Sequence, residues 1–173
     1  MDCWDNRDFV QIHGMHIDEN DDIFCIDDGA HVVYKFDKNR KLLMILGNKG
    51  KPSDTGFITS DFKVEHSGPP FNRPTDITIS RYKDLYVTDG YGNACIHKFQ
   101  ANRTHEFSWG SPGDKSSQFC LPHGIAISNE DIIYVADREN GRIQLFNLHS
   151  EYIDEWTALV RPGALFIDKN NML

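Results

Sequence analysis

Two histidines in this chain combine a residue type and a spacing that could bind a metal ion. His13 and His123 each precede a glycine and an apolar run, and an aspartate follows each of them fourteen residues later. Neutral imidazole is a common zinc ligand, and a catalytic zinc usually has three protein ligands. Thr75 fills the equivalent position between the two histidines, so only two ligands are visible. Alternatively, each His-Gly pair caps a turn or fills a channel mouth, and the spacing leaves both roles open.

A tyrosine and an arginine form a second candidate group. Tyr91 and Arg138 follow closing aspartates in the segments DGYGN and DRENGR. Equivalent loops of adjacent repeats lie on the same side, so we expect the phenol and the guanidinium near the histidines. Arginine suits bidentate binding of a carboxylate, and a phenol beside a cation gives up its proton more readily. These residues predict a carboxylate-binding, proton-transferring pocket. For the Asp and Asn of these loops, we favour hydrogen bonding to turn backbone.

The elements that position these residues are three copies of one layout. The copies read IHGMHIDENDDIFCIDD from Ile12, RPTDITISRYKDLYVTD from Arg73 and LPHGIAISNEDIIYVAD from Leu121. Each copy contains two short strands around a polar turn, and two further alternating runs follow it. Repeated units of four short strands are typical of a β-propeller. We therefore predict an all-β propeller.

Spacing between the closing aspartates locates the blades. Asp27 and Asp89 are 62 residues apart, whereas Asp89 and Asp137 are 48 apart, and the excess is rich in Gly, Pro, Ser and Lys. We predict one partial propeller domain over 1–173, with an inter-blade loop at 48–71, blades at about 10–47, 72–110 and 120–157, and the first strand of another blade within 161–173. Repeat units bury their apolar faces on their neighbours, so we expect a fragment or an arc that associates with itself.

Composition narrows the function classes. Hydrophobic residues make up 39% of the chain without any apolar run near the ~18 residues of a membrane span, so we expect no span. The net charge of −8 opposes nucleic-acid binding. The cysteines lack metal or disulfide spacing and are expected to be free, half-buried thiols: Cys3, Cys25, Cys95 and Cys120. Asn102 begins a glycosylation sequon, which matters only in the secretory pathway.

Two pairs of segments carry a resemblance to a known family. FNRPTDITIS with DLYVTDGYGN, and LPHGIAIS with IYVADRENGRIQLF, resemble NHL-repeat propellers and, more closely, peptidyl-α-hydroxyglycine α-amidating lyases. The resemblance covers roughly Ile12 to Trp156, and the ADRENGRIQ string from Ala136 is its most specific part. It implies an arc of a six-bladed NHL-type β-propeller and a carbon–nitrogen lyase. That lyase cleaves a peptide ending in α-hydroxyglycine to an amidated peptide and glyoxylate.

The resemblance also implies roles for individual residues. His13 and His123 match zinc ligands, Tyr91 matches the catalytic tyrosine, and Arg138 matches a pocket arginine. With a metal supplying Lewis acidity, Tyr91 would remove the hydroxyl proton while Arg138 holds the carboxylate. A structural calcium would bind the backbone carbonyl of Met15. The resemblance further implies a location in the secretory lumen or outside the cell, and an upstream hydroxylating monooxygenase domain.

Several functional residues of the family pattern have no counterpart in this sequence. The family's third zinc histidine and a calcium-binding aspartate match positions beyond Leu173, and another pocket arginine matches a position before Met1. We therefore expect little or no lyase activity from the chain alone. The alternative function is a non-catalytic NHL propeller that binds a peptide or protein partner, and a nucleic-acid module ranks last.

The family's two disulfides are also missing. Their cysteine positions match Asn72 with Gly92, and Tyr134 with Leu145, and none of these four residues is a cysteine. Paired loss is expected of a divergent relative, and it weakens any argument for secretion.

Overall fold

The structure is a computed structural model that describes residues 9–61 and 63–173, and it confirms the predicted all-β fold. The first sheet holds β1 (Ile12–Ile17), β2 (Ile23–Asp27), β3 (Val32–Phe36) and β4 (Leu42–Gly47). The second holds β5 (Pro74–Ile79), β6 (Leu85–Asp89), β7 (Cys95–Phe99) and β8 (His105–Trp109). The third holds β11 (Pro122–Ile127), β12 (Ile133–Asp137), β13 (Arg142–Phe146) and β14 (Tyr152–Trp156). Between the second and third sheets, a short parallel pair consists of β9 (Ser111–Pro112) and β10 (Gln118–Phe119).

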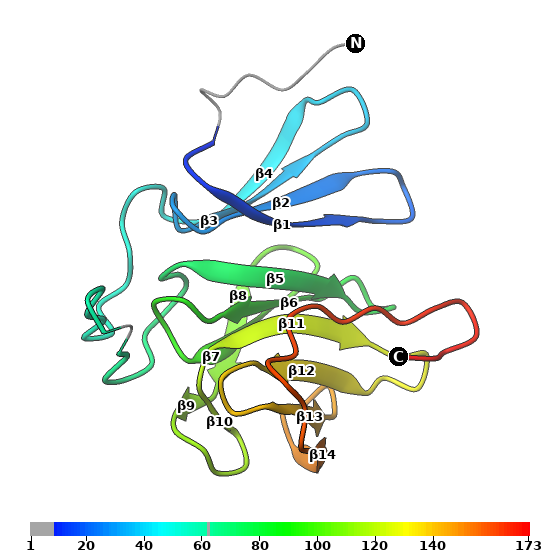
Figure 1. The fold of residues 1–173 in the computed structure, drawn as a ribbon. Coiled ribbons are helices and arrows are strands. Elements are labelled where there is room, and N and C mark those ends of the chain that lie inside the picture. The colour runs from blue at the N-terminus through cyan, green and yellow to red at the C-terminus, as the bar shows by residue number, and fades with distance from the viewer. Residues whose placement is uncertain (1–8, 62) are drawn as a thin grey trace.

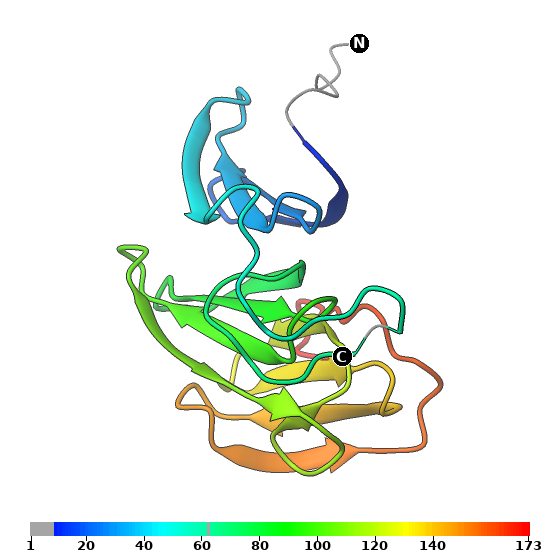
Figure 2. The ribbon, with the colours of Figure 1, turned by 90° about the vertical axis from the view of Figure 1, so that its left-hand side faces the viewer.

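The three four-stranded sheets are the blades of an open propeller arc. Each is antiparallel, with its strands hydrogen-bonded in chain order. The blades follow one another in space as in sequence (Figures 1 and 2). The first strands are neighbours, since β5 contacts both β1 and β11. Any residue near the start of a first strand is therefore brought towards its equivalents in the other blades.

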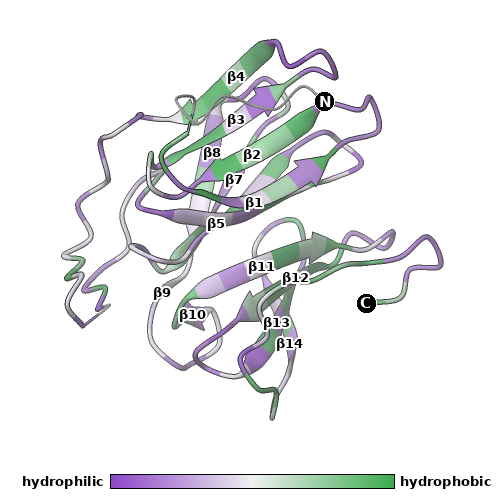
Figure 3. Cartoon of the chain, turned by 45° about the horizontal axis from the view of Figure 1, so that its top comes forward, coloured by the Kyte–Doolittle hydropathy of each residue, from purple (hydrophilic) through white to green (hydrophobic). Residues whose placement is uncertain are grey.

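Apolar side chains between neighbouring blades form the core. One cluster joins the first and second blades and includes Phe24, Ile26, Phe71 and Val87. Another joins the second and third blades and includes Ile96, Phe119, Val135 and Phe146. The strands carry most hydrophobic residues and the turns most hydrophilic ones (Figure 3). Each blade thus buries at least one face on a neighbouring blade, as expected for repeat units.

The closing aspartates stabilise the turns, as their position predicts. Asp27, Asp89 and Asp137 are fully buried at the ends of second strands. Their carboxylates accept backbone N–H groups that precede the first strand: Gln11 donates to Asp27, Asn72 to Asp89 and Cys120 to Asp137, each at 2.8 Å. These bonds fix the chain where each blade begins, which is where the candidate histidines lie.

The segments outside the blades are largely irregular. The described residues of 48–73 form no named strand, although Ile58 and Lys63 make an isolated bridge. Residues 157–173, which include the segment expected to open another blade, form no named strand. In each observed blade the first strand pairs with the second strand of the same blade, and these residues have no such partner. The segment instead runs beside β11 (Figure 1). No helix in the described ranges is long and apolar enough to span a membrane.

A buried carboxyl group couples the second blade to the third and makes stability depend on pH. Asp76 on β5 accepts the backbone N–H of Ile77 at 2.9 Å and that of Ile125 on β11 at 3.1 Å. Burial raises its pKa to about 6 from 3.8. Between these values the folded protein retains a proton that the unfolded chain has lost, so this contribution to stability falls as pH rises.

We therefore expect the wild type to lose more stability between pH 4 and pH 7 than Asp76→Asn loses. Urea unfolding of both proteins at the two pH values measures this difference. A gap in the free energy of unfolding that stays constant across the interval would contradict the assignment.

Candidate functional site

The two candidate histidines lie side by side although 110 residues separate them in the sequence. His13 is on β1 and His123 on β11, and their ring centroids are 4.7 Å apart. Both side chains are half-buried. Convergence of the first strands therefore brings the imidazoles of the first and third blades together.

Each imidazole is oriented by a backbone carbonyl of the segment beside it. His13 Nδ1 lies 2.7 Å from the carbonyl oxygen of Thr75, and His123 Nδ1 lies 2.8 Å from that of Gly163. A carbonyl only accepts hydrogen bonds, so both Nδ1 atoms must carry the proton. In a neutral ring this leaves Nε2 with a free lone pair. Metal-binding histidines are commonly oriented in this way.

The glycines that follow the histidines permit this close approach. A Cβ atom at Gly14 would lie 2.9 Å from the Thr75 carbonyl oxygen, and one at Gly124 would lie 2.6 Å from that of Gly163. These are the same carbonyls that bind the two imidazoles. The His-Gly dipeptide thus has a specific use, because the glycine lets the neighbouring backbone approach and the histidine binds to it.

Tyr91, in the β6–β7 loop, bridges the two imidazoles. Its hydroxyl oxygen lies 3.1 Å from His13 Nε2 and 3.1 Å from His123 Nε2. The hydroxyl has one proton, so it can donate to only one of two neutral Nε2 acceptors. The hydroxyl oxygen and the two Nε2 nitrogens, which all carry lone pairs, therefore have a single proton between them. That arrangement fits a cation, which could be bound by both nitrogens.

Burial keeps one of these imidazoles neutral. The pKa of His123 is lowered mainly by desolvation, while the Gly163 carbonyl opposes the shift and the nearby His13 and Arg138 contribute to it. A neutral ring at physiological pH retains the lone pair that binds a metal.

Arg138 completes the group that the sequence predicted. Its Nη1 lies 3.4 Å from the Tyr91 hydroxyl, and its guanidinium carbon lies 5.5 Å from the centre of the Tyr91 ring. Its Nε donates to Glu139 at 2.9 Å, and Glu139 also accepts from Arg161 at 2.7 Å. The guanidinium is thereby held at the site, with Nη1 directed at the phenol.

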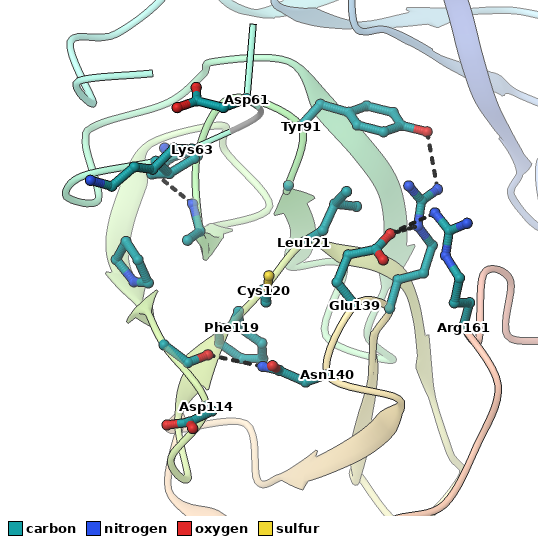
Figure 4. Close-up of a pocket in the computed structure, with 17 residues that line it drawn as sticks. Asp61, Lys63, Tyr91, Asp114, Phe119, Cys120, Leu121, Glu139, Asn140 and Arg161 are labelled. Carbon is teal, nitrogen blue, oxygen red and sulfur yellow. Dashed lines mark hydrogen bonds and ion pairs between the residues drawn. The ribbon is translucent and has the colours of Figure 1, made fainter. Parts of the chain in front are cut away.

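A pocket opens beside Tyr91 and Arg138, between the second and third blades (Figure 4). Its volume is about 700 Å³, within the range of small-molecule sites. Apolar parts of Phe119, Leu121 and Ala94 contribute to its walls. The structure thus places the predicted phenol and guanidinium at the edge of a cavity that could accept a peptide end.

The two remaining candidates, Met15 and Asn102, are exposed at the surface. Met15 is on β1 opposite Cys25, and its side chain is 64% exposed. Asn102 is exposed in the β7–β8 turn, where its side chain accepts the Thr104 N–H at 2.9 Å. In the ranges 9–61 and 63–173, no group of three or more His, Cys, Asp and Glu could hold a metal ion. Among the described residues, the two histidines therefore lie together without a third His, Cys, Asp or Glu that would complete a metal-binding group.

The cysteines differ in part from the prediction. Cys25 and Cys95 are free but buried rather than half-buried, because both lie on inner strands, and Cys120 is free and exposed. Cys3 lies outside the described residues.

The positions that match family disulfides are nevertheless adjacent. Gly92 N donates to the Asn72 carbonyl at 3.0 Å, and Tyr134 pairs with Leu145 across β12 and β13. Non-covalent contacts therefore occupy both places.

Sequence reasoning missed Arg73 and Asp28. The Arg73 guanidinium carbon lies 5.2 Å from the centre of the Tyr91 ring, and its Nη2 bonds the buried Asp28 carboxylate at 2.6 Å. The repeat gives no signal for Arg73, since the equivalent positions hold Gln11, Leu121 and Arg161.

Comparisons with known proteins agree with this fold. The NHL repeat model matches residues 71–99 and 119–146, which contain β5–β7 and β11–β13. Over 143 residues the chain is 34% identical to "Probable peptidyl-alpha-hydroxyglycine alpha-amidating lyase pgal-1" of Caenorhabditis elegans, covering 80% of this chain and 37% of that protein. It is also 34% identical over 156 residues to "Peptidylglycine alpha-amidating monooxygenase" of Rattus norvegicus, covering 85% of this chain and 15% of that protein.

Among solved structures, the one described as "Streptogramin B lyase structure" matches with a TM-score of 0.62. The sequences are 18% identical, and the match covers 92% of this chain and 46% of that one, so it supports the fold alone. The chain spans only 37% and 15% of the two curated relatives named above. By fold the chain is a partial NHL-type β-propeller, and by sequence it is similar to the peptidyl-α-hydroxyglycine α-amidating lyases.

Proposed function

We propose that this chain carries part of the site of a lyase that cleaves peptidyl-α-hydroxyglycine to an amidated peptide and glyoxylate. The observation that supports this most is the Tyr91 hydroxyl, at 3.1 Å from the Nε2 atoms of both His13 and His123. A phenol shared by two oriented imidazoles suits proton transfer beside a metal ion. Because the chain spans a minor part of its relatives, this activity is proposed for the whole protein.

The donor set fits zinc. Nε2 of His13 and Nε2 of His123 would hold the ion, which when bound supplies Lewis acidity to a substrate oxygen. We propose no third ligand from the described residues. A structural calcium at the Met15 carbonyl, by resemblance, belongs to the same proposal.

The protein residues have separate roles in the reaction. Arg138 binds the carboxylate of the α-hydroxyglycine unit through its guanidinium. Tyr91 acts as the base in its deprotonated form, which a bound cation favours, and accepts the proton of the substrate hydroxyl while the new C=O bond forms and the C–N bond breaks. That proton is then delivered to the departing amide nitrogen. The products are the amidated peptide and glyoxylate, with no other reactant required.

Glyoxylate release tests this function. The assay uses excess zinc-loaded chain over a synthetic α-hydroxyglycine peptide, so that even slow cleavage is visible. We expect zinc-dependent glyoxylate, at a low rate because only two histidine ligands are present among the described residues. Because the proposal concerns the whole protein, absence of zinc-dependent glyoxylate from both this chain and the whole protein would count against the lyase and favour the alternative.

Arg138 gives a test of substrate binding. Arg138→Gln should weaken binding of the α-hydroxyglycine peptide by about 10- to 100-fold, since a hydrogen bond to a charged group contributes about 1.5–3 kcal/mol. Isothermal titration calorimetry measures the affinity. The matched control is Arg103→Gln, at an exposed arginine in the β7–β8 turn. Equal affinity in the Arg138 variant and the wild type would exclude the proposed carboxylate contact.

The alternative function is a non-catalytic NHL propeller in which the same pocket binds a peptide or protein partner. The observation that favours it is the two-histidine ligand set within the described residues. Peptide binding without zinc-dependent cleavage would select this alternative.

The source of the substrate and the cellular location of the activity are also proposals. A hydroxylating monooxygenase would supply the α-hydroxyglycine peptide, and one relative is named for a monooxygenase. In that setting the protein would work in the secretory lumen or outside the cell. Asn102, which is exposed, would then be open to glycosylation.

A further inference from the structure

Arg73 contacts Tyr91 through both its backbone and its side chain. Its guanidinium carbon lies 5.2 Å from the centre of the phenol ring, in the range of a cation–π contact. The Arg73 carbonyl accepts the backbone N–H of Tyr91 at 3.3 Å. Through these two contacts, Arg73 can influence the position of the Tyr91 ring.

The first blade fixes the Arg73 side chain. Arg73 Nε and Nη2 donate to the same Asp28 oxygen at 3.1 and 2.6 Å. Asp28 is fully buried in the β2–β3 connection, whereas the Arg73 side chain is 22% exposed. An ion pair with one fully buried partner is held more firmly than a surface pair, and loss of either partner leaves a buried charge uncompensated.

A second contact fixes the Arg73 backbone to the same connection. The Arg73 N–H donates to His31 Nδ1 at 3.1 Å. Burial is the main cause of the lowered pKa of His31, which favours the neutral ring that can accept this bond. Arg73 is thus attached to the first blade by its backbone and its side chain while it contacts Tyr91 of the second blade.

This attachment matters because the site combines both blades. His13 comes from the first blade and Tyr91 from the second, and their Nε2 and hydroxyl oxygen must stay within hydrogen-bond distance. We propose that Arg73, held by Asp28, is a positioning residue that keeps the Tyr91 hydroxyl between the two imidazoles. Its effect on cleavage rests on the function proposed above, whereas its effect on geometry does not.

The test measures a hydrogen bond of His123, a residue of the site that Arg73 is not described as contacting. The Nε2 signal of His123 in ¹⁵N spectra of histidine-labelled protein reports its hydrogen bond to Tyr91, and no contact joins Arg73 to His123 among those described for either residue. We expect Arg73→Gln and Asp28→Asn to move this signal towards its position in Tyr91→Phe. Arg73→Lys should have an intermediate effect, because lysine keeps the charge but lacks the planar fork.

Arg81→Gln is the matched control. It also breaks an Arg–Asp ion pair, with Asp131 at 2.9 Å, but the Arg81 side chain is 53% exposed on another part of the second blade. It should leave the His123 signal unchanged. A His123 signal that stays at its wild-type position in folded Arg73→Gln or Asp28→Asn would overturn the proposal, even if those variants were less stable.

Single-turnover glyoxylate release gives the second readout. Misplacement of a catalytic group costs up to about 100-fold, so we expect the Arg73→Gln rate to fall by about 10- to 100-fold at saturating chain. An unchanged rate would contradict the positioning role. If neither this chain nor the whole protein releases glyoxylate, the proposed function fails, and the His123 signal still decides whether Arg73 positions Tyr91.

Discussion

Tyr91→Phe is expected to lower glyoxylate release by about 10²- to 10⁴-fold, the usual contribution of a general acid–base group. The substitution keeps the ring that packs against His13, at 5.0 Å between centroids, and removes the oxygen that lies 3.1 Å from both Nε2 atoms. The loss should appear in the cleavage step. Single-turnover rates at saturating chain separate that step from peptide binding.

Zinc binding distinguishes this effect from damage to the site. The Tyr91→Phe protein should still bind zinc, because both imidazoles retain their backbone carbonyl partners. Tyr134→Phe is a matched control, since Tyr134 lies on β12 and pairs with Leu145. Release by Tyr91→Phe at the wild-type rate would mean that the phenol transfers no proton in the reaction.

His123→Ala is expected to weaken zinc binding by more than about 100-fold. Loss of a group that merely orients a ligand costs about 10- to 100-fold in affinity, so loss of the ligand itself should cost more. His123 is one of two imidazoles in the group, with its Nδ1 proton held by the Gly163 carbonyl at 2.8 Å. Competition with a chromogenic chelator measures the affinity.

His149→Ala controls for general loss of surface histidine. His149 is exposed in the turn before β14 and should leave the affinity unchanged. Equal zinc affinity in His123→Ala and the wild type would place any bound zinc elsewhere.

The sequence predicts the blades well because alternation of apolar and polar residues records which face of each strand is buried. The sequence also predicts that one group of residues lies together, because equivalent positions in a propeller converge near the axis. These residues are His13, Tyr91, His123 and Arg138. Their contacts in the structure agree with that reasoning. The expected strand within 161–173 does not form, since residue pattern alone does not supply a pairing partner.

Other parts of the site depend on contacts that no local pattern records. The carbonyls that orient the imidazoles belong to neighbouring segments, so their positions follow from packing between blades. Arg73 lies at the start of a repeat, where it reads as part of the layout rather than as a functional residue. Asp28 follows the closing Asp27 and reads as a turn residue, although it is fully buried and binds Arg73.

The central claim is that His13, His123 and Tyr91 form one site for a metal ion and the α-hydroxyglycine end of a peptide. Zinc K-edge X-ray absorption of the zinc-loaded chain, with and without that peptide, tests it most directly. We expect scattering from imidazole nitrogens that disappears in the His13→Ala/His123→Ala double variant, and an oxygen environment that changes when the peptide is added. Thiolate sulfur around the zinc, or a spectrum unchanged by the double substitution, would contradict it.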